Sequence, residues 1–156
     1  MCMNDYYEKI LQAKVYEVAK KTPLEKAHNL SNKLNNEIFL KREDLQDVFS
    51  FKIRGAYNKM SKLTNSQLSQ GVITSSAGNH AQGVALSALR LKTKATILMP
   101  ITTPIVKVNA VKELKAEIIL FGDNYDESYI EAQRLSKERE LSFIHPFNDP
   151  EVIAGQ

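Results

Sequence analysis

The sequence has little of what secreted and membrane proteins depend on. Its 156 residues include one cysteine, Cys2, so no disulfide can form within the chain. No apolar run approaches the ~20 residues that a membrane-spanning helix needs, and the N-terminus lacks the apolar segment of a signal peptide. We therefore expect a cytoplasmic protein without a membrane partner, in which Cys2 is an inert thiol in a frayed terminus.

Strong charge and metal-ligand spacing are also absent. The net charge is only +3, and lysine and arginine are scattered among acidic residues without a basic run. This pattern predicts no nucleic-acid partner. His28 and His145 have no cysteine, histidine or carboxylate at ligand spacing, so no metal site is predicted.

Glycine is scarce, and its positions exclude one kind of site. A phosphate dianion is normally bound by converging backbone N–H groups in a glycine-rich turn at a helix N-terminus. The six glycines form no such cluster: they are Gly55, Gly71, Gly78, Gly83, Gly122 and Gly155. The sequence therefore predicts no phosphate-binding turn.

What is present is enough apolar sequence for an ordinary soluble core, with 43% hydrophobic and 25% charged residues. Apolar spacings of three and four predict a helix over residues 5–20, ended by Thr22-Pro23. A short helix around Leu30 and Leu34 and a strand over residues 37–41 follow. These first fifty residues offer few contacts to one another, so we expect them to form one half of a layer.

From residue 72 onward, strands and helices alternate. Strands are predicted over residues 72–74, 95–99, 117–121 and 142–145, and helices over residues 79–91, 104–114 and 125–141. Thr103 is the expected N-cap of the middle helix, with Pro104 as its first residue and Ile105 on its buried stripe. This alternation predicts an α/β fold: an open parallel sheet of about four strands with helices on both faces.

Two motifs carry candidate chemistry. Ser50-Phe51-Lys52-Ile53-Arg54-Gly55-Ala56 begins a predicted helix, and Ser75-Ser76-Ala77-Gly78-Asn79-His80 lies where a strand gives way to a helix. Open α/β sheets bind ligands at this end of their strands, and the partial positive charge of a helix N-terminus favours a carboxylate. The alternatives are a solvated surface lysine and a plain N-cap, because Asn and Ser are favoured there without any ligand.

These motifs resemble a known family. Ser50 to Gly55 matches the lysine motif of the fold-type II pyridoxal-phosphate enzymes. With residues 41–46 before it and residues 76–83 after it, the whole chain resembles the threonine dehydratases, especially the biosynthetic form.

The resemblance implies a division of the chain. Residues 1–49 would be an incomplete N-terminal part of the larger cofactor-binding domain, residues 50–146 the small open α/β domain, and residues 147–156 the start of the return into the larger domain. The glycine-rich phosphate loop of the family follows later, so the resemblance implies an N-terminal portion of an enzyme, whose activity on its own is doubtful.

Roles for particular residues are implied in the same way. Lys52 would bind the aldehyde of pyridoxal 5'-phosphate covalently, Phe51 would stack near the cofactor ring, and Asn79 would hydrogen-bond the ring hydroxyl. A core position for Phe51 and a packing role for His80 are equally open. The substrate carboxylate would be bound by the loop made of Ser75, Ser76, Ala77, Gly78, Asn79 and His80.

A reactive Lys52 must be neutral, and this requirement predicts its surroundings. Its pKa must fall from about 10.4 to roughly 7 or 8, which corresponds to ~4 kcal/mol and requires a substantially buried site. Arg54 could add positive potential. The charged residues Arg42, Glu43 and Asp44 are expected to form a structural ion pair near the site, or otherwise a solvated charge run.

The reaction implied is the β-elimination of L-threonine to 2-oxobutanoate and ammonia, the first step of isoleucine biosynthesis, in a homo-oligomer acting on a small amino acid. The alternatives are an L-serine or catabolic threonine dehydratase, a serine racemase relative, and a catalytically silent fragment acting only through association. Racemases of the group carry serine at the position of Ala77, and alanine has no proton to exchange. A racemase is therefore disfavoured.

Overall fold

The computed structural model describes residues 3–156, with side chains from Tyr6 onward. The prediction for Cys2 lies outside the described residues. The elements in chain order are α1 (Met3–Leu11), η1 (Val15–Glu17), β1 (Leu24–Lys26), α2 (His28–Leu34), β2 (Phe39–Lys41), η2 (Glu43–Leu45), α3 (Lys52–Met60), α4 (Asn65–Gln70), β3 (Val72–Ser75), α5 (Asn79–Leu91), β4 (Ala95–Met99), α6 (Ile105–Glu113), β5 (Glu117–Leu120), α7 (Tyr125–Glu138), β6 (Ser142–Phe143) and α8 (Pro150–Gly155).

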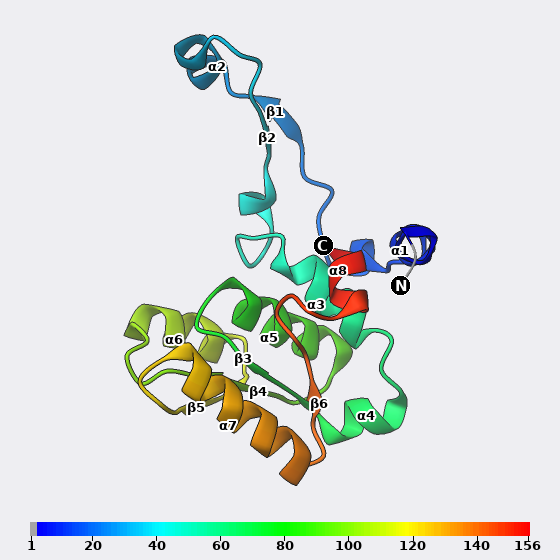
Figure 1. Ribbon diagram of the computed structural model, residues 1–156, viewed down its shortest axis with the longest axis vertical. Helices are drawn as coiled ribbons and strands as arrows, with labels where there is room; N and C mark the ends of the chain where they lie inside the picture. The colour runs from blue at the N-terminus through cyan, green and yellow to red at the C-terminus, as the bar shows by residue number, and fades with distance from the viewer. Residues whose placement is uncertain (1–2) are drawn as a thin grey trace.

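A four-stranded parallel sheet lies in the lower part of the molecule, between α5 and α7 (Figure 1), as predicted. Its strand order is β5-β4-β3-β6, with Val72 opposite both Ala95 and Ser142. Every residue of β3 and β4 is buried. Central parallel strands covered on both faces are apolar throughout, which explains their continuous hydrophobic runs.

Helices cover both faces of this sheet, as predicted. Alternate residues of a strand point to opposite faces, so Val72 joins the cluster formed with α3, α5 and α6, whereas Ile73 packs against α7. The α7 side is closed by Ala132 and Leu135. The fold class predicted from the sequence is confirmed.

Helix α3 lies between α5 and α8, and glycines allow α8 to approach it closely. A Cβ atom on Gly55 would lie 2.6 Å from the carbonyl oxygen of Val152, and one on Gly155 would lie 2.7 Å from the carbonyl oxygen of Arg54. Asn58 of α3 also donates a hydrogen bond to the carbonyl of Glu151 at 2.7 Å. These contacts fix the end of the described chain against α3.

The helix predicted over residues 5–20 is wrong beyond α1, which ends at Leu11. Backbone N–H groups further along bond to side chains from distant parts of the chain: that of Lys14 donates to Asn58, and that of Lys20 donates to Gln46. Tertiary partners therefore replace the helical acceptors that the apolar spacing indicated.

The predicted start of α6 is also displaced. The Thr103 N–H donates to the carbonyl of Pro100 in a turn, and Pro104 rather than Thr103 occupies the N-cap. Ile105, expected on the buried stripe, is 70% exposed. Val111 is the buried residue of this helix.

Two short helices were not expected from periodicity, since each has only six residues. Helix α4 begins with a capping box in which the Thr64 side chain accepts from the Gln67 N–H and Gln67 bonds back to Thr64. Helix α8 begins with Asp149 as N-cap and Pro150 in the first turn.

The segment from β1 to β2 extends away from the rest of the molecule (Figure 1). Strands β1 and β2 pair in an antiparallel register, with Leu24 opposite Lys41 and Lys26 opposite Phe39. Its apolar side chains Leu24, Leu34 and Phe39 are all more than half exposed. The expectation of few contacts holds for these side chains but not for all of the first fifty residues, because Lys20 bonds to Gln46 and Ala19 and Val48 pack with Ile53 and Leu86. The predicted domain boundaries stay a prediction. Within residues 3–156, no helix is sufficiently long and apolar to cross a membrane.

The close packing of α8 on α3 leads to a first prediction. Gly155→Ala should lower the free energy of unfolding by about 1–3 kcal/mol, because the new methyl group meets backbone atoms that cannot rotate away. Gly78→Ala is the matched control, since a Cβ there meets nothing within 4 Å. Urea unfolding followed by circular dichroism measures both, and an equal effect of the two changes would contradict the packing argument.

Candidate active site

Three segments distant in the sequence meet at Lys52. The Lys52 Nζ donates hydrogen bonds to the carbonyl of Pro146 (3.0 Å) and to Oε1 of Gln156 (3.2 Å). A Cβ on Gly83 would lie 3.0 Å from the carbonyl oxygen of Lys52, so the start of α3 touches the second turn of α5. The Lys52 backbone therefore lies beside the second turn of α5, and the Lys52 amine is close enough to His80 in the first turn to influence its pKa.

The surroundings of Lys52 favour a neutral amine. Burial lowers the pKa of the Lys52 amine below its ordinary value. Both of its hydrogen-bond acceptors are uncharged oxygens, so neither restores the preference for the ammonium form as a carboxylate would. The aromatic ring of Phe51 lies 5.3 Å from Nζ, and Phe51 is 43% exposed. The core position considered for Phe51 is therefore wrong.

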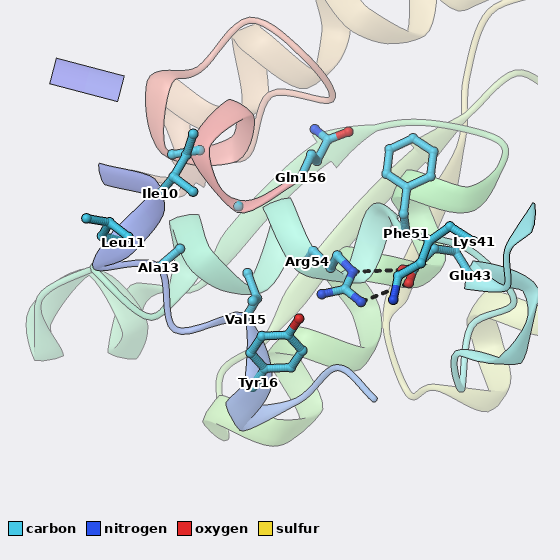
Figure 2. Close-up of a pocket in the computed structure, with 12 residues that line it drawn as sticks. Ile10, Leu11, Ala13, Val15, Tyr16, Lys41, Glu43, Phe51, Arg54 and Gln156 are labelled. Atoms are coloured by element: carbon cyan, nitrogen blue, oxygen red, sulfur yellow. Dashed lines mark hydrogen bonds and ion pairs between the residues drawn. The ribbon is translucent and has the colours of Figure 1, made fainter. Parts of the chain in front are cut away.

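Arg54 does not supply the positive potential that we considered for it. Its guanidinium donates to Glu43 through Nε (2.7 Å) and Nη2 (2.8 Å) and lies over the ring of Tyr16 (Figure 2). The hydrogen bond from Arg54 is the main cause that lowers the pKa of Glu43 to about 2. The charge of Arg54 is thus compensated by a carboxylate, and burial is the cause of the lowered pKa of Lys52.

The structural ion pair expected near the site is this pair of Glu43 and Arg54, whose side chains are 15% and 9% exposed. Arg42 and Asp44 instead form a pair at the surface. The predicted ion pair is therefore confirmed for Glu43, while Arg42 and Asp44 match the solvated alternative.

A hollow of about 540 Å³ lies between the N-terminal segment, α3 and the chain end (Figure 2). Ile10 and Val15 from the N-terminal segment, Phe51 and Arg54 from α3, and Gln156 from the chain end line it. The charged groups in its lining are all engaged: Glu43 is paired with Arg54, and Lys41 donates to the carbonyl of Thr22. We therefore place the candidate active site at Lys52 and the turn before α5.

The turn before α5 combines a cap with unused donors. Ser76 Oγ accepts from the N–H groups of Gly78 and Ala81, both at 3.3 Å. The plain capping alternative is therefore partly realised, by Ser76 and not by Asn79. The first N–H groups of a helix have no partner within it, which leaves donors at this end for an anion. The Asn79 side chain is exposed, and Gly78 faces open space.

His80 and Ser75 are buried at the same point. The His80 ring is 3% exposed, and its Nε2 donates to the carbonyl of Ile144 at 3.1 Å, which requires the proton on Nε2. The structural role considered for His80 is therefore confirmed for its Nε2 side, which bonds to the backbone. The other ring nitrogen, Nδ1, and Ser75 Oγ are buried without a hydrogen-bond partner. Burial lowers the pKa of His80 to about 4, with the charge of Lys52 adding to the effect.

The partners of Lys52 in the last twelve residues were not found from the sequence. Pro146 and Gln156 act through a backbone carbonyl and an amide, groups that carry no distinctive sequence signal. Asp149-Pro150 could have indicated the start of α8 and hence the return of the chain to Lys52. Within residues 3–156, no cluster of three or more metal-ligating side chains is present.

Comparison with known proteins identifies the family. Residues 15–156 match the family model described as pyridoxal-phosphate dependent enzyme. The chain belongs to this family. It is 55% identical to the biosynthetic L-threonine dehydratase of Burkholderia multivorans over 100% of this chain and 31% of that protein. The biosynthetic chloroplastic threonine dehydratase of Arabidopsis thaliana is 55% identical over 97% of this chain and 26% of the relative.

Solved structures agree with these relatives. The processed form of threonine deaminase isoform 2 from Solanum lycopersicum superposes with a TM-score of 0.92 at 51% identity, covering 97% of this chain and 44% of that one. Maize serine racemase has a TM-score of 0.89 at 32% identity, covering 98% and 46%. The chain thus spans about a quarter to a third of the length of the curated relatives it matches.

The residues present fit the part of pyridoxal phosphate that reacts. The Lys52 amine is half-buried and bonded to uncharged oxygens only, as attack on an aldehyde requires. Nearby, the buried Ser75 Oγ and His80 Nδ1 have no hydrogen-bond partner and can still bind a polar group. The roles of Lys52 and the turn residues toward cofactor and substrate stay predictions.

The buried His80 predicts a pH dependence. An unfolded histidine titrates near 6.5 and folded His80 near 4, so the unfolded state binds the proton first as the pH falls. His80 should therefore cost about 3 kcal/mol of stability between about pH 7 and pH 4. His80→Gln keeps a donor for the Ile144 carbonyl but does not titrate. Urea unfolding across this pH range should show a smaller loss for His80→Gln, and parallel curves would contradict the prediction.

Proposed function

We propose that the chain carries the catalytic lysine and the substrate-carboxylate turn of a biosynthetic threonine dehydratase, which converts L-threonine to 2-oxobutanoate and ammonia. The observation that carries this proposal is a half-buried lysine amine with uncharged acceptors beside a helix N-terminus. The choice of substrate is supported by curated threonine dehydratases at 50–57% identity, whereas serine racemase structures stand at 30–32%.

Each residue has a definite task in this proposal. The Lys52 amine would hold the cofactor through its aldehyde carbon, and when free it would accept the α-proton of the substrate. The turn from Ser75 to His80 would bind the substrate carboxylate, and Asn79 would contact the cofactor ring. When bound, pyridoxal phosphate supplies the electron sink that makes the α-proton acidic. The α-proton and the β-hydroxyl would together leave as water, and hydrolysis of the enamine would give the 2-oxo acid and ammonia.

A chimera tests this function. Residues 1–156 replace the matching segment of the Burkholderia multivorans enzyme, whose remaining length they do not cover. We expect the chimera to release 2-oxobutanoate from L-threonine, measured by coupled reduction, and Lys52→Ala to lower the rate by at least about a thousandfold because the base and covalent anchor are lost.

The substrate comparison belongs to the same assay. Faster turnover of L-serine than of L-threonine, or formation of D-serine, would favour the other branches of the family. Thr64→Ala is the matched control, since it lies in the exposed cap of α4. An inactive chimera beside an active parent enzyme would contradict the proposal.

A second candidate function is association with other chains. It is favoured by the exposed apolar side chains of the segment from β1 to β2 and of α1, where Tyr7 and Leu11 are 66% and 68% exposed. Apolar surface of this kind marks contact sites.

We therefore expect the 156-residue chain to self-associate, which light scattering over a concentration series measures. Leu24→Lys together with Phe39→Lys should reduce the association, whereas the same change at the exposed Leu89 of α5 should not. A monodisperse monomer at high concentration would contradict this candidate.

A further inference from the structure

His145 closes the turn through which the chain leaves the sheet toward α8. Its Nδ1 accepts hydrogen bonds from the backbone N–H groups of Phe147 (3.2 Å) and Asn148 (2.8 Å). A ring nitrogen accepts a hydrogen bond only when it carries no proton. The side chain can therefore close the turn over residues 145–148 only while it is neutral, with its proton on Nε2.

The turn closed by His145 also carries an acceptor of the Lys52 amine. Pro146 lies within it, and its carbonyl accepts from Lys52 Nζ at 3.0 Å. Proline has no backbone N–H, so it cannot add a hydrogen bond that would hold the turn itself. Before the turn, the Ile144 carbonyl is held by two side-chain donors. Between Ile144 and the cap of α8, the His145 ring thus binds the backbone N–H groups, and Lys52 binds the Pro146 carbonyl.

Aromatic contacts hold the ring in this orientation. The ring centroid of His145 lies 4.6 Å from that of Phe147 with the planes at 90°, and 5.8 Å from that of Tyr129 at 74°. Edge contacts of this kind fix an aromatic ring. The ring of His145 cannot turn away without losing them.

Ionisable groups face His145 from every element around it. Asp149 lies at the start of α8, Tyr129 and Lys137 are on α7, His80 is on α5, and Lys52 is reached through Pro146. Asp149 favours the protonated ring, but burial outweighs it, so the pKa of His145 lies below its ordinary value.

We propose that His145 is a positioning residue, which holds the Pro146 carbonyl against the Lys52 amine while its ring is neutral and releases it when the ring is protonated. Protonation places an N–H against the N–H groups of Phe147 and Asn148, and these donors repel one another. The turn then opens and Lys52 loses an acceptor. The inference rests on the proposed function only in taking Lys52 as the reactive amine.

The test follows Lys52 and His145 in the 156-residue chain without cofactor or substrate. Lysine side chains labelled with ¹³C at Cε report the surroundings of each amine by NMR, and Lys52→Arg identifies the Lys52 signal. Histidine labelled at Cε1 reports the protonation of His145. We expect the Lys52 signal to show a step at the pH at which the His145 ring titrates.

Two variants separate the hydrogen bond from the ring. His145→Asn offers an oxygen near the place of Nδ1 but does not titrate, so the step in the Lys52 signal should disappear while Phe147 and Asn148 amides still exchange slowly. His145→Phe keeps a ring without an acceptor, so these amides should exchange at least about tenfold faster and the Lys52 signal should be displaced at every pH. His28→Asn on α2 is the matched control and should change neither signal.

Two results would overturn the proposal: a wild-type Lys52 signal without a step where His145 titrates, or a His145→Phe chain with fast amide exchange and an unchanged Lys52 signal. The second would mean a merely structural role. If His145→Phe does not fold, the comparison of wild type with His145→Asn decides alone. No readout in this test depends on turnover. The chimera can therefore be inactive while the Lys52 signal still responds to His145, and the chimera can be active while the Lys52 signal shows no response.

Discussion

The contact of helix α3 with α5 on one side and α8 on the other is the constraint on which the site depends. Gly83 brings α5 against the backbone of Lys52, and Gly55 and Gly155 bring α8 to the opposite side. Since glycine has no side chain, backbone atoms that cannot adapt by changing rotamers come into close contact at each of these three positions. The position of the Lys52 backbone is therefore set by the packing of the fold and not by the loop before it.

Given that position, the electrostatics of the site follow from which charges are paired. Arg54 lies two residues after Lys52 in α3 and donates to the Glu43 carboxylate. This carboxylate also accepts hydrogen bonds from Thr22 and Gln46. This network ties the N-terminal segment to α3. Lys52 receives only a carbonyl and an amide oxygen, so burial acts on its amine without a compensating negative charge. Arg54 is thus paired with a carboxylate, whereas Lys52 in the same helix is not.

Much of the fold could be predicted from local pattern. Strands β3 and β4 and helix α5 lie where the alternation predicted them. Parallel strands that are buried on both faces require continuous apolar runs, and these runs can be read directly from the sequence. Predictions failed where distant residues replaced local partners. The backbone N–H groups of Lys14 and Lys20 bond to the side chains of Asn58 and Gln46 instead of continuing a helix, and the N–H of Thr103 bonds to Pro100 in a turn. Neither event leaves a local pattern.

For the site, the sequence by itself determined the candidates: Lys52 at the start of a helix, and the turn from Ser75 to His80 between a strand and a helix. Residue type and neighbours along the chain are sufficient for that, because lysine chemistry and helix polarity are local properties. Only the tertiary structure decided that Pro146 and Gln156 accept from Lys52, that Arg54 faces Glu43, and that His80 is buried against Ile144. These contacts join residues up to 104 positions apart, and their existence depends on how helices and strands pack, which no short stretch of sequence specifies.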